Sequence, residues 1–430
     1  MHHLLVGTLP HITLRNLSKI YGPLMHLKLG EVSTVVVTSR EIARELFTTH
    51  DLKFASRPNI IAADIAIYGG MDILFAPYGA YWRQIRKICV MEILSAKRVL
   101  SFRHVREEEV LDLVKQINLM SSSHSTANLS EMLHSLTNNI TSRVAFGMKC
   151  KDVGEYLKAM KEGRLIQSSK LLSRNGEKLG KYGEGSEGEA VEGNILDVLF
   201  NLQAQGGLVG FPFTQTTIKA VIFDIFAAGS GTAASSMTWT MSELIRNPRV
   251  MKKLQAEIRE ALRGKASVSE EDITNLSYLQ LVIKESLRLH PPAPLLVPRE
   301  CTETCKINGH IIPKKSRVIF NAWAMGRTPG TGTTLRSSSR RGSSRARAQS
   351  ISWGVATSTY HLEGEEDLSR GAFWASYHGA NIGATFISLR LGFAQGVSEL
   401  DMSESPGLGA RRKFDLCLRA TPYGPAYVLN

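Results

Sequence analysis

Cysteine is scarce in this chain and follows no recognisable spacing. The odd number of cysteines is scattered over 430 residues: Cys89, Cys150, Cys301, Cys305 and Cys417. This excludes a disulfide framework and favours a reducing compartment. Compositional bias is absent too, because charged residues at 21% and apolar residues at 43% are ordinary for a globular protein. Collagen-like and wholly disordered chains are therefore excluded.

A long apolar run at the N-terminus is also lacking. The opening stretch MHHLLVGTLP is too short and too weakly apolar for a secretory signal or a membrane span. From the sequence as written we expect no membrane anchor and a cytoplasmic or peripheral location. The net charge of +13 would suit nucleic acid, an anionic membrane surface or an acidic partner. Much of this excess, however, lies in one Ser/Arg-rich tract.

Residues 214–248 have the length and apolar content of a long buried helix. Thr214 is placed to cap its start, and Pro248 to end it. In its middle lies AAGSGTAASS, although each interior glycine costs about 1 kcal/mol of helix propensity relative to alanine. Either a flat or reactive group lies against these small residues, or another helix packs closely there. The stretch alone does not decide between the two.

Two further segments predict helices with paired side chains. Trp82 and Arg86 lie at i and i+4 on one helix face, where they form a surface cation–π contact or hold a buried anionic group. Glu285 and Arg288 lie three residues apart, a spacing most often found in solvated pairs.

Shorter signals predict β structure and loops. Residues 23–39 have two apolar runs on either side of a Gly-Glu turn, which predicts a hairpin, and Ser39 predicts the cap of the next helix. The Asn308-Gly309 pair predicts a second hairpin. Residues 156–193 are rich in Lys, Glu, Gly and Ser and have no apolar period, which predicts a poorly patterned connection.

Taken together, these features resemble the cytochrome P-450 family, and most closely the plant members that hydroxylate terpenoids and other specialised metabolites. The matching stretches occur in family order: YGPLMHLKLG, FAPYGAYWRQIRKIC, IKAVIFDIFAAGSGTAASSMTW, KESLRLHPPAPLLVPRE and NAWAMGR. The resemblance covers roughly residues 1–155 and 194–327. It returns at ELDMSESPGLGARRKFDLCLRATPY.

The resemblance implies a mainly α (α+β) fold: one large helical domain over residues 1–430 with a small β region and a disrupted C-terminal part. It implies haem as cofactor, an apolar small-molecule substrate, an NADPH-dependent reductase as partner and the endoplasmic reticulum membrane as location. Ala228, Gly229 and Thr232 would lie over the haem where dioxygen is split, with the Thr232 hydroxyl relaying a proton.

The remaining site residues are assigned in the same way. Trp82, Arg86 and Arg299 would hold the haem propionates. Glu285 and Arg288 would form a buried structural pair that supports the loop carrying the iron ligand. No residue of this chain is assigned as that ligand, because residues 328–398 contain no cysteine.

The chain departs from the family in several places. Gly231 stands where the family has an acidic residue before the threonine, and the family's membrane anchor is not present in this sequence. Residues 328–398 lack both the Pro-Glu-Arg-Phe motif and the Phe-Gly-x-Gly-x-Arg-x-Cys-x-Gly loop. Since the thiolate's electron donation drives O–O cleavage, the chain as written is expected to be inactive.

A reading-frame error is one hypothesis for residues 328–398. Shifted back by one nucleotide, codons for residues 332–343 can spell Trp-Asp-Asp-Ala-Glu-Glu-Phe-Lys-Pro-Glu-Arg-Phe. Shifted forward, codons for residues 365–371 can spell Arg-Arg-Ile-Cys-Pro-Gly. The alternatives are a non-catalytic relative that binds an apolar ligand or a protein, and an RNA-binding Ser/Arg tract. No aromatic residues interleave SSSRRGSSRARAQS, so we expect no nucleic-acid partner.

Overall fold

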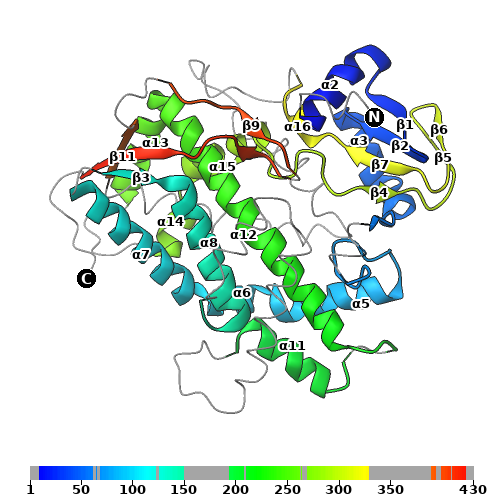
Figure 1. Cartoon of the computed structure of the whole chain (residues 1–430), viewed down its shortest axis with the longest axis horizontal. Coiled ribbons are helices and arrows are strands. Elements are labelled where there is room, and N and C mark those ends of the chain that lie inside the picture. Colours follow the sequence, from blue (N-terminus) through cyan, green and yellow to red (C-terminus); the bar gives the residue numbers. More distant parts are fainter. Residues whose placement is uncertain are drawn as a thin grey trace. The chain divides into compact units, whose positions relative to one another are not determined.

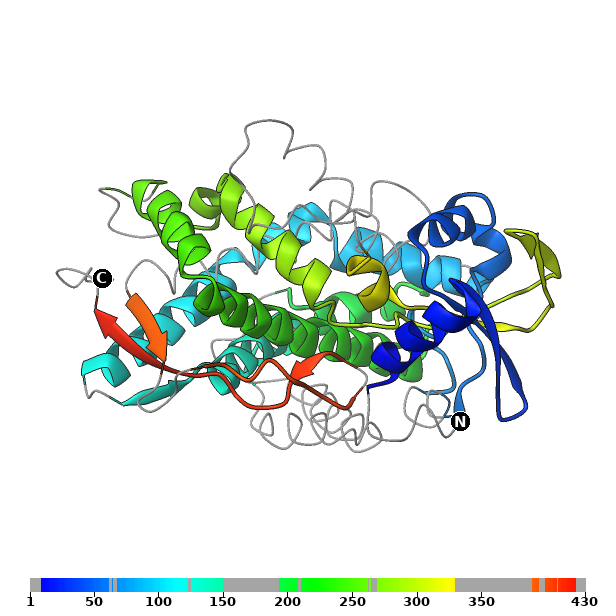
Figure 2. The same cartoon turned by 90° about the horizontal axis from the view of Figure 1, so that it is seen from above.

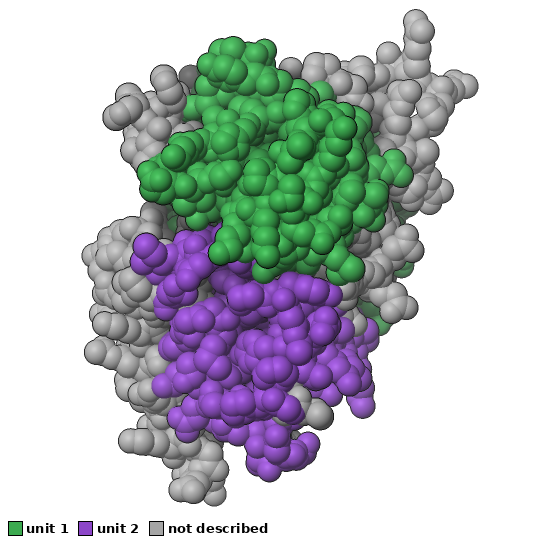
Figure 3. Space-filling model, turned by 90° about the vertical axis from the view of Figure 1, so that its right-hand side faces the viewer, with its two compact units in different colours: residues 1–56, 114–130, 235–430 green, residues 57–113, 131–234 purple. Residues whose placement is uncertain are grey.

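The chain divides into two compact units, which are coloured separately in Figure 3. Unit 1 comprises Met1–Ser56, Val114–Ser130 and Ser235–Asn430, and unit 2 comprises Arg57–Leu113 and Glu131–Ala234. The computed structural model describes residues 9–61, 64, 68–122, 125–149, 193–207, 210–261, 263, 269–328, 389–393, 399–407 and 409–422. The predicted connection over residues 156–193 lies outside the described residues, except for residue 193. Of residues 328–398, only Thr328 and the strand Leu389–Phe393 are described.

Unit 2 is helical in its described part. Its helices are α5 (Ala80–Ile88), the π-helical turn η2 (Cys89–Ile93), α6 (Ala96–Ser101), most of α8 (Leu129–Phe146), α11 (Ile195–Ala204) and the first parts of α7 (Arg103–Ser122) and α12 (Gln215–Arg246). The core of the unit joins α12 to α11 and α5 through buried side chains such as Phe226, Leu199 and Ile85. This packing places the small-residue part of α12 next to an apolar core.

Unit 1 combines helices with small sheets. Its helical elements are α2 (Pro10–Tyr21), α3 (Arg40–Thr48), η1 (Asp51–Phe54), α13 (Pro248–Ala261), α14 (Glu270–Thr274), α15 (Ser277–Leu289) and α16 (Ala322–Gly326). The largest sheet has the order β1-β2-β7-β4, from β1 (Leu24–Leu29), β2 (Val32–Val37), β7 (Arg317–Phe320) and β4 (Arg299–Glu300). Figures 1 and 2 show α2 and α3 beside this sheet.

The local sequence rules explain the first hairpin and the next helix. β1 and β2 pair antiparallel, from Leu24 opposite Val37 to Leu29 opposite Val32. Gly30 has a φ of 65°, which glycine adopts at little cost. The Ser39 side chain then accepts hydrogen bonds from two backbone N–H groups of α3. The predicted hairpin and the predicted cap are both confirmed.

The second hairpin follows the same logic. β5 (Cys305–Ile307) pairs antiparallel with β6 (His310–Ile312). Between them, Asn308 and Gly309 have φ values of 45° and 82°, the left-handed conformations that a tight primed turn requires.

Helix α12 runs without a break from Gln215 to Arg246, so its interior glycines are helical. Thr214 caps it, since Thr217 N donates to Thr214 Oγ1 at 3.3 Å. The helix ends two residues before Pro248, which instead starts α13. In the described part of the chain α12 alone is long and apolar enough to cross a membrane, but 67% of its apolar window is buried inside the protein. It is therefore a core helix.

The C-terminal stretch completes unit 1. β11 (Cys417–Pro422) pairs antiparallel with β3 (Thr126–Asn128) and with β8 (Leu389–Phe393). Upstream, the short strands β9 (Glu404–Ser405) and β10 (Arg411–Arg412) pair with each other. Trp239 Nε1 on α12 donates to the carbonyl oxygen of Ala410 at 2.8 Å. Residues on both sides of the divergent stretch thus fold together.

A carboxylate from one helix caps the start of another. Glu257 on α13 accepts hydrogen bonds from the backbone N–H groups of Tyr278 at 2.8 Å and Leu279 at 3.0 Å, in the first turn of α15. The residue before α15 is Leu276, which has no capping side chain. Glu257 therefore satisfies donors that a helix start otherwise leaves unpaired, and its charge suits the helix dipole.

We expect the Glu257→Ala substitution to lower the free energy of unfolding by about 1 kcal/mol, as loss of a helix cap does. Urea unfolding followed by circular dichroism measures it. The matched control is Glu260→Ala on the same helix, because the Glu260 side chain is 76% exposed and lies 3.8 Å from Arg263. That exposed pair is worth about 0.3 kcal/mol. Equal losses in the two variants would contradict the capping role.

Candidate functional site

Trp82 and Arg86 lie on α5 in unit 2. The Trp82 side chain is buried, and its Nε1 donates to the carbonyl oxygen of Ile73 at 3.0 Å. The Arg86 guanidinium lies 5.5 Å from the Trp82 ring centroid. The two side chains therefore contact each other along one face of α5, but Trp82 is buried and not on the surface. Its indole N–H is already bound by a backbone carbonyl oxygen.

Ala228, Gly229 and Thr232 lie in the small-residue part of α12, also in unit 2. Ala228 is exposed, Gly229 is buried, and Thr232 is half-buried. The Thr232 hydroxyl donates to the carbonyl oxygen of Ala228 within the helix. Gly231 offers no side chain that could pass a proton to this hydroxyl.

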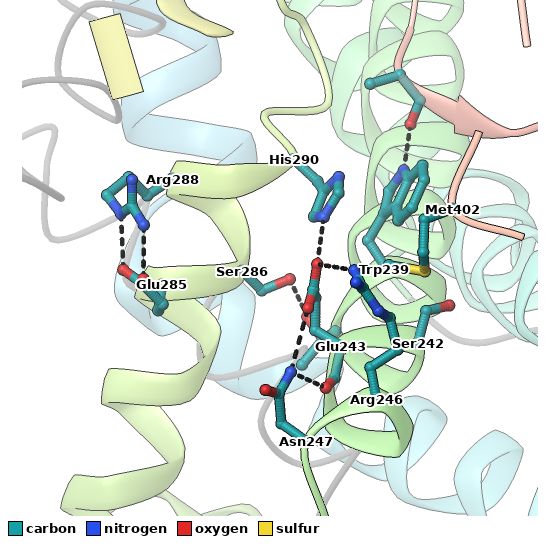
Figure 4. A network of polar contacts seen from close by, with 12 residues as sticks. Trp239, Ser242, Glu243, Arg246, Asn247, Glu285, Ser286, Arg288, His290 and Met402 are labelled. Carbon is teal, nitrogen blue, oxygen red and sulfur yellow. Dashed lines mark hydrogen bonds and ion pairs between the residues drawn. The ribbon is translucent and has the colours of Figure 1, made fainter. Parts of the chain in front are cut away.

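Glu285 and Arg288 form a bidentate ion pair on α15 in unit 1, drawn in Figure 4. Arg288 Nε and Nη2 lie 2.7 and 2.6 Å from the two carboxylate oxygens, and Arg288 Nη1 donates to the carbonyl oxygen of Gly326 at the end of α16. The side chains are 19% and 10% exposed. The pair thus joins two helices, and it lines a cavity of about 330 Å³ together with residues of α12 and α13.

Arg299 lies in β4 of unit 1 and is buried. Its Nη1 lies 2.6 Å from Asp51 Oδ1, and its guanidinium lies 4.7 Å from the Phe47 ring centroid. Burial lowers the pKa of Arg299, whereas Asp51 raises it. A carboxylate of the protein itself thus holds this arginine.

A second polar network in unit 1 was not found from the sequence. His290 Nε2 lies 2.8 Å from Glu243 Oε1, and the imidazole stacks on Trp239 with 4.0 Å between centroids (Figure 4). Glu404, on the C-terminal stretch, lies 2.9 Å from His11 Nε2 and accepts from Trp323 Nε1 at 3.3 Å. In the sequence, His290 directly follows the helix that carries Glu285 and Arg288, and this position could have pointed to the network.

His290 contacts the carboxylate of Glu243, and His11 contacts that of Glu404. Each contact joins segments that are distant in the sequence. Burial lowers the pKa of His290, and Glu243 opposes this. Burial raises the pKa of Glu404, but the hydrogen bond and charge of His11 and the charges of His290 and Arg327 together hold it below its usual value. The network therefore binds the C-terminal stretch to α2 and α15.

The described cysteines are poor candidates for an iron ligand, which must be a thiolate. Burial raises the pKa of Cys89 far above its usual value, and burial raises the pKa of Cys301 to about 12. Cys305 is buried in the β5–β6 hairpin, and Cys417 starts β11. Within the described residues no three His, Cys, Asp or Glu side chains converge as a metal site.

The chain belongs to the cytochrome P-450 family. A sequence model of this family matches residues 1–173 and 190–330. Desmethyl-deoxy-podophyllotoxin synthase from Sinopodophyllum hexandrum is 48% identical, over 76% of this chain and 71% of that protein. Premnaspirodiene oxygenase from Hyoscyamus muticus is 40% identical, over 98% and 90%. Germacrene A hydroxylase from Barnadesia spinosa is 40% identical, over 99% and 90%.

A solved structure shows the same fold. A zebra fish cytochrome P-450 superposes with a TM-score of 0.80 at 22% identity, and the match covers 97% of this chain and 99% of that one. The predicted family and the mainly α (α+β) fold are therefore confirmed. Haem is the cofactor of this family, whose members are monooxygenases.

The predicted site residues form two groups. Trp82, Arg86, Ala228, Gly229 and Thr232 belong to unit 2, and within it the structure brings Trp82 to Arg86 and Thr232 to Ala228. Glu285, Arg288 and Arg299 belong to unit 1, where Glu285 contacts Arg288. Their roles around a haem stay predictions.

The chain's donor set does not fit a thiolate-ligated haem. The resemblance puts the family's ligand position within residues 328–398, which contain no cysteine. The described buried thiols with raised pKa values do not replace it, since a protonated thiol is a weak ligand. The propionate donors expected at Trp82 and Arg299 are also engaged, by Ile73 and Asp51.

Proposed function

We propose that this chain derives from a haem-thiolate monooxygenase and, as its sequence reads, does not carry out that reaction. The parent activity inserts one oxygen atom of O₂ into an apolar small molecule. The observation that carries the proposal is the absence of cysteine from residues 328–398. The replacement of the proton-relay acid by Gly231 supports it.

The proposed substrate class, partner and location follow from the relatives. Two of them are named for oxygenating premnaspirodiene and hydroxylating germacrene A, which supports a terpenoid-like substrate for the parent enzyme. A monooxygenase of this family needs two electrons for each O₂, so the partner is an NADPH-dependent reductase. We place the parent enzyme at the endoplasmic reticulum membrane.

Sequencing the transcript across residues 328–398 tests the origin of the divergent stretch. If the reading-frame hypothesis is correct, one or two missing or extra nucleotides will restore the Pro-Glu-Arg-Phe motif and the cysteine loop. An uninterrupted frame encoding the residues of this chain would show that the change is genuine. The structure gives a reason for this test, because residues 399–422 fold with unit 1 as an in-frame continuation would.

A second candidate function is a non-catalytic relative that binds an apolar ligand or a protein partner. The favouring observation is that the protein itself satisfies Trp82 and Arg299, so neither side chain requires haem. The bound haem and the oligomeric state of the purified chain separate the candidates. A stable monomer free of haem supports the binding module, and stoichiometric haem contradicts it.

A further inference from the structure

Two carboxyl groups are buried together in unit 2, and neither belongs to the residues assigned to haem. Asp72 lies in the turn before α5 and has no exposed surface, and Asp224 lies on α12 and is 8% exposed. A charged residue in the apolar run IFDIF is costly, because an unpaired buried charge pays a large desolvation penalty. In the structure, both carboxyl groups accept hydrogen bonds from the backbone of one turn.

Asp224 accepts hydrogen bonds from the backbone of a turn that is distant in the sequence. Ile73 N and Leu74 N both donate to Asp224 Oδ2, at 2.8 and 3.2 Å. Asp72 Oδ1 accepts from Phe75 N at 3.1 Å within the same turn. The other oxygen of Asp72 is buried without a hydrogen-bond partner among the described groups. Asp72 and Asp224 act on each other as side-chain hydrogen-bond partners, so one proton on the pair would close a bond between them.

The surroundings favour retention of that proton. Burial raises the pKa of Asp72 to about 6, with Arg57 lowering it in part. Burial, and then the charge of Asp72, raises the pKa of Asp224. Arg57 is itself buried, and its charge acts on Asp72.

Two other titratable groups among the described residues face the pair, and both are neutral in this pH range. Burial raises the pKa of the Tyr81 phenol, with Asp72 adding to the shift, and burial raises the pKa of the Cys89 thiol, with Asp224 adding to it. Neither group can supply a compensating charge.

The turn that the pair holds also fixes α5. Tyr81 Oη donates to the carbonyl oxygen of Met71 at 2.8 Å, and Trp82 Nε1 donates to that of Ile73. The carboxyl pair therefore sets the position of the turn to which α5 is attached.

We propose that Asp72 and Asp224 share one proton and act as a pH-sensitive latch that fastens residues 71–75 to α12. With one proton the two carboxyls hydrogen bond and the turn is held. When that proton leaves to solvent, two like charges face each other in a buried site and the turn is released. The latch does not rest on the proposed function, although the turn that it holds also accepts the indole N–H of Trp82.

The sign of the pH effect follows from proton binding. Because the folded pKa is above the unfolded value, the folded state holds the proton where the unfolded state has lost it. The contribution of the pair to stability is therefore fully present at acid pH and falls as pH rises from 3.8 to about 6. For Asp72 alone, the ratio of folded to unfolded protein falls roughly a hundredfold over this window.

The test is the pH dependence of thermal unfolding in the chain and in Asp224→Asn. The asparagine keeps an oxygen for Ile73 N and Leu74 N and supplies an N–H for Asp72, so it mimics the closed latch. We expect the stability of the wild type relative to the variant to fall between pH about 4 and about 7. The control is Asp112→Asn, which removes an exposed carboxylate of unit 2 that lies 3.8 Å from Lys149. It should keep the wild-type profile.

Infrared spectroscopy of the wild type gives a second readout that needs no variant to fold. A protonated carboxyl stretch should be present at pH about 5 and lost by about 8. In Asp72→Asn the band should disappear at a lower pH than in the wild type, because the charge of Asp72 no longer raises the pKa of Asp224. The proposal is overturned if Asp224→Asn keeps the wild-type pH slope, or if the wild type shows no protonated carboxyl at pH about 5.

Discussion

The purified chain, reduced under carbon monoxide, should show no thiolate-type Soret band. That band requires a cysteine thiolate on the iron, and the family's ligand stretch in residues 328–398 contains no cysteine. Cys301 does not substitute, because it is buried and its pKa is raised to about 12 by burial. Haem that associates with the chain through another group should give a non-thiolate spectrum. A normal thiolate-type band from the chain as written would contradict the proposed function.

The control for this measurement is a chain in which residues 332–371 are re-read in the shifted frames, so that both family motifs return. We expect a thiolate-type band in this restored chain. We expect it to disappear again when the restored cysteine alone is replaced by alanine. This pair of variants differs by one sulfur atom, so it separates ligand loss from misfolding. A restored chain that folds and binds haem without the band would reject the reading-frame hypothesis.

The local parts of the fold could be predicted from the sequence because they depend on neighbouring residues. A glycine turn, the Ser39 cap and the Asn308-Gly309 turn each act over a few positions, and all three lie where they were predicted. Long-range pairing could not be predicted in this way. β2 runs parallel to β7, with Val35 opposite Val318, and no local rule links two strands so far apart in the chain.

In the candidate site, too, local pairs could be predicted from the sequence and long-range contacts could not. Trp82, Arg86, Glu285 and Arg288 were found because each pair lies within one helical turn. Partners contributed by distant segments were missed, since sequence alone gives no account of what a side chain meets in space. Asp51 beside Arg299 is one example, and the backbone N–H groups beside Asp224 are another.

The second large effect is expected at the ion pair of α15. Replacing Glu285 with glutamine leaves the Arg288 guanidinium, which is 10% exposed, without its bidentate carboxylate. Removal of one partner from a buried pair strands the other charge, and we expect a loss of about 3 kcal/mol in the free energy of unfolding. Since domains are stable by only about 5–15 kcal/mol, unit 1 would unfold at markedly lower urea concentration.

The matched control is Glu31→Gln. Glu31 pairs with Lys28 at 3.7 Å, but their side chains are 97% and 66% exposed, so the loss should be within about 0.5 kcal/mol. The Arg288 contact to the Gly326 carbonyl oxygen makes a further distinction possible. If the pair positions α16, amide exchange in Ala322–Gly326 should rise in Glu285→Gln and stay unchanged in the control. Equal stability of the two variants would show that the pair is solvated, and the structural role inferred from the family resemblance would then fail.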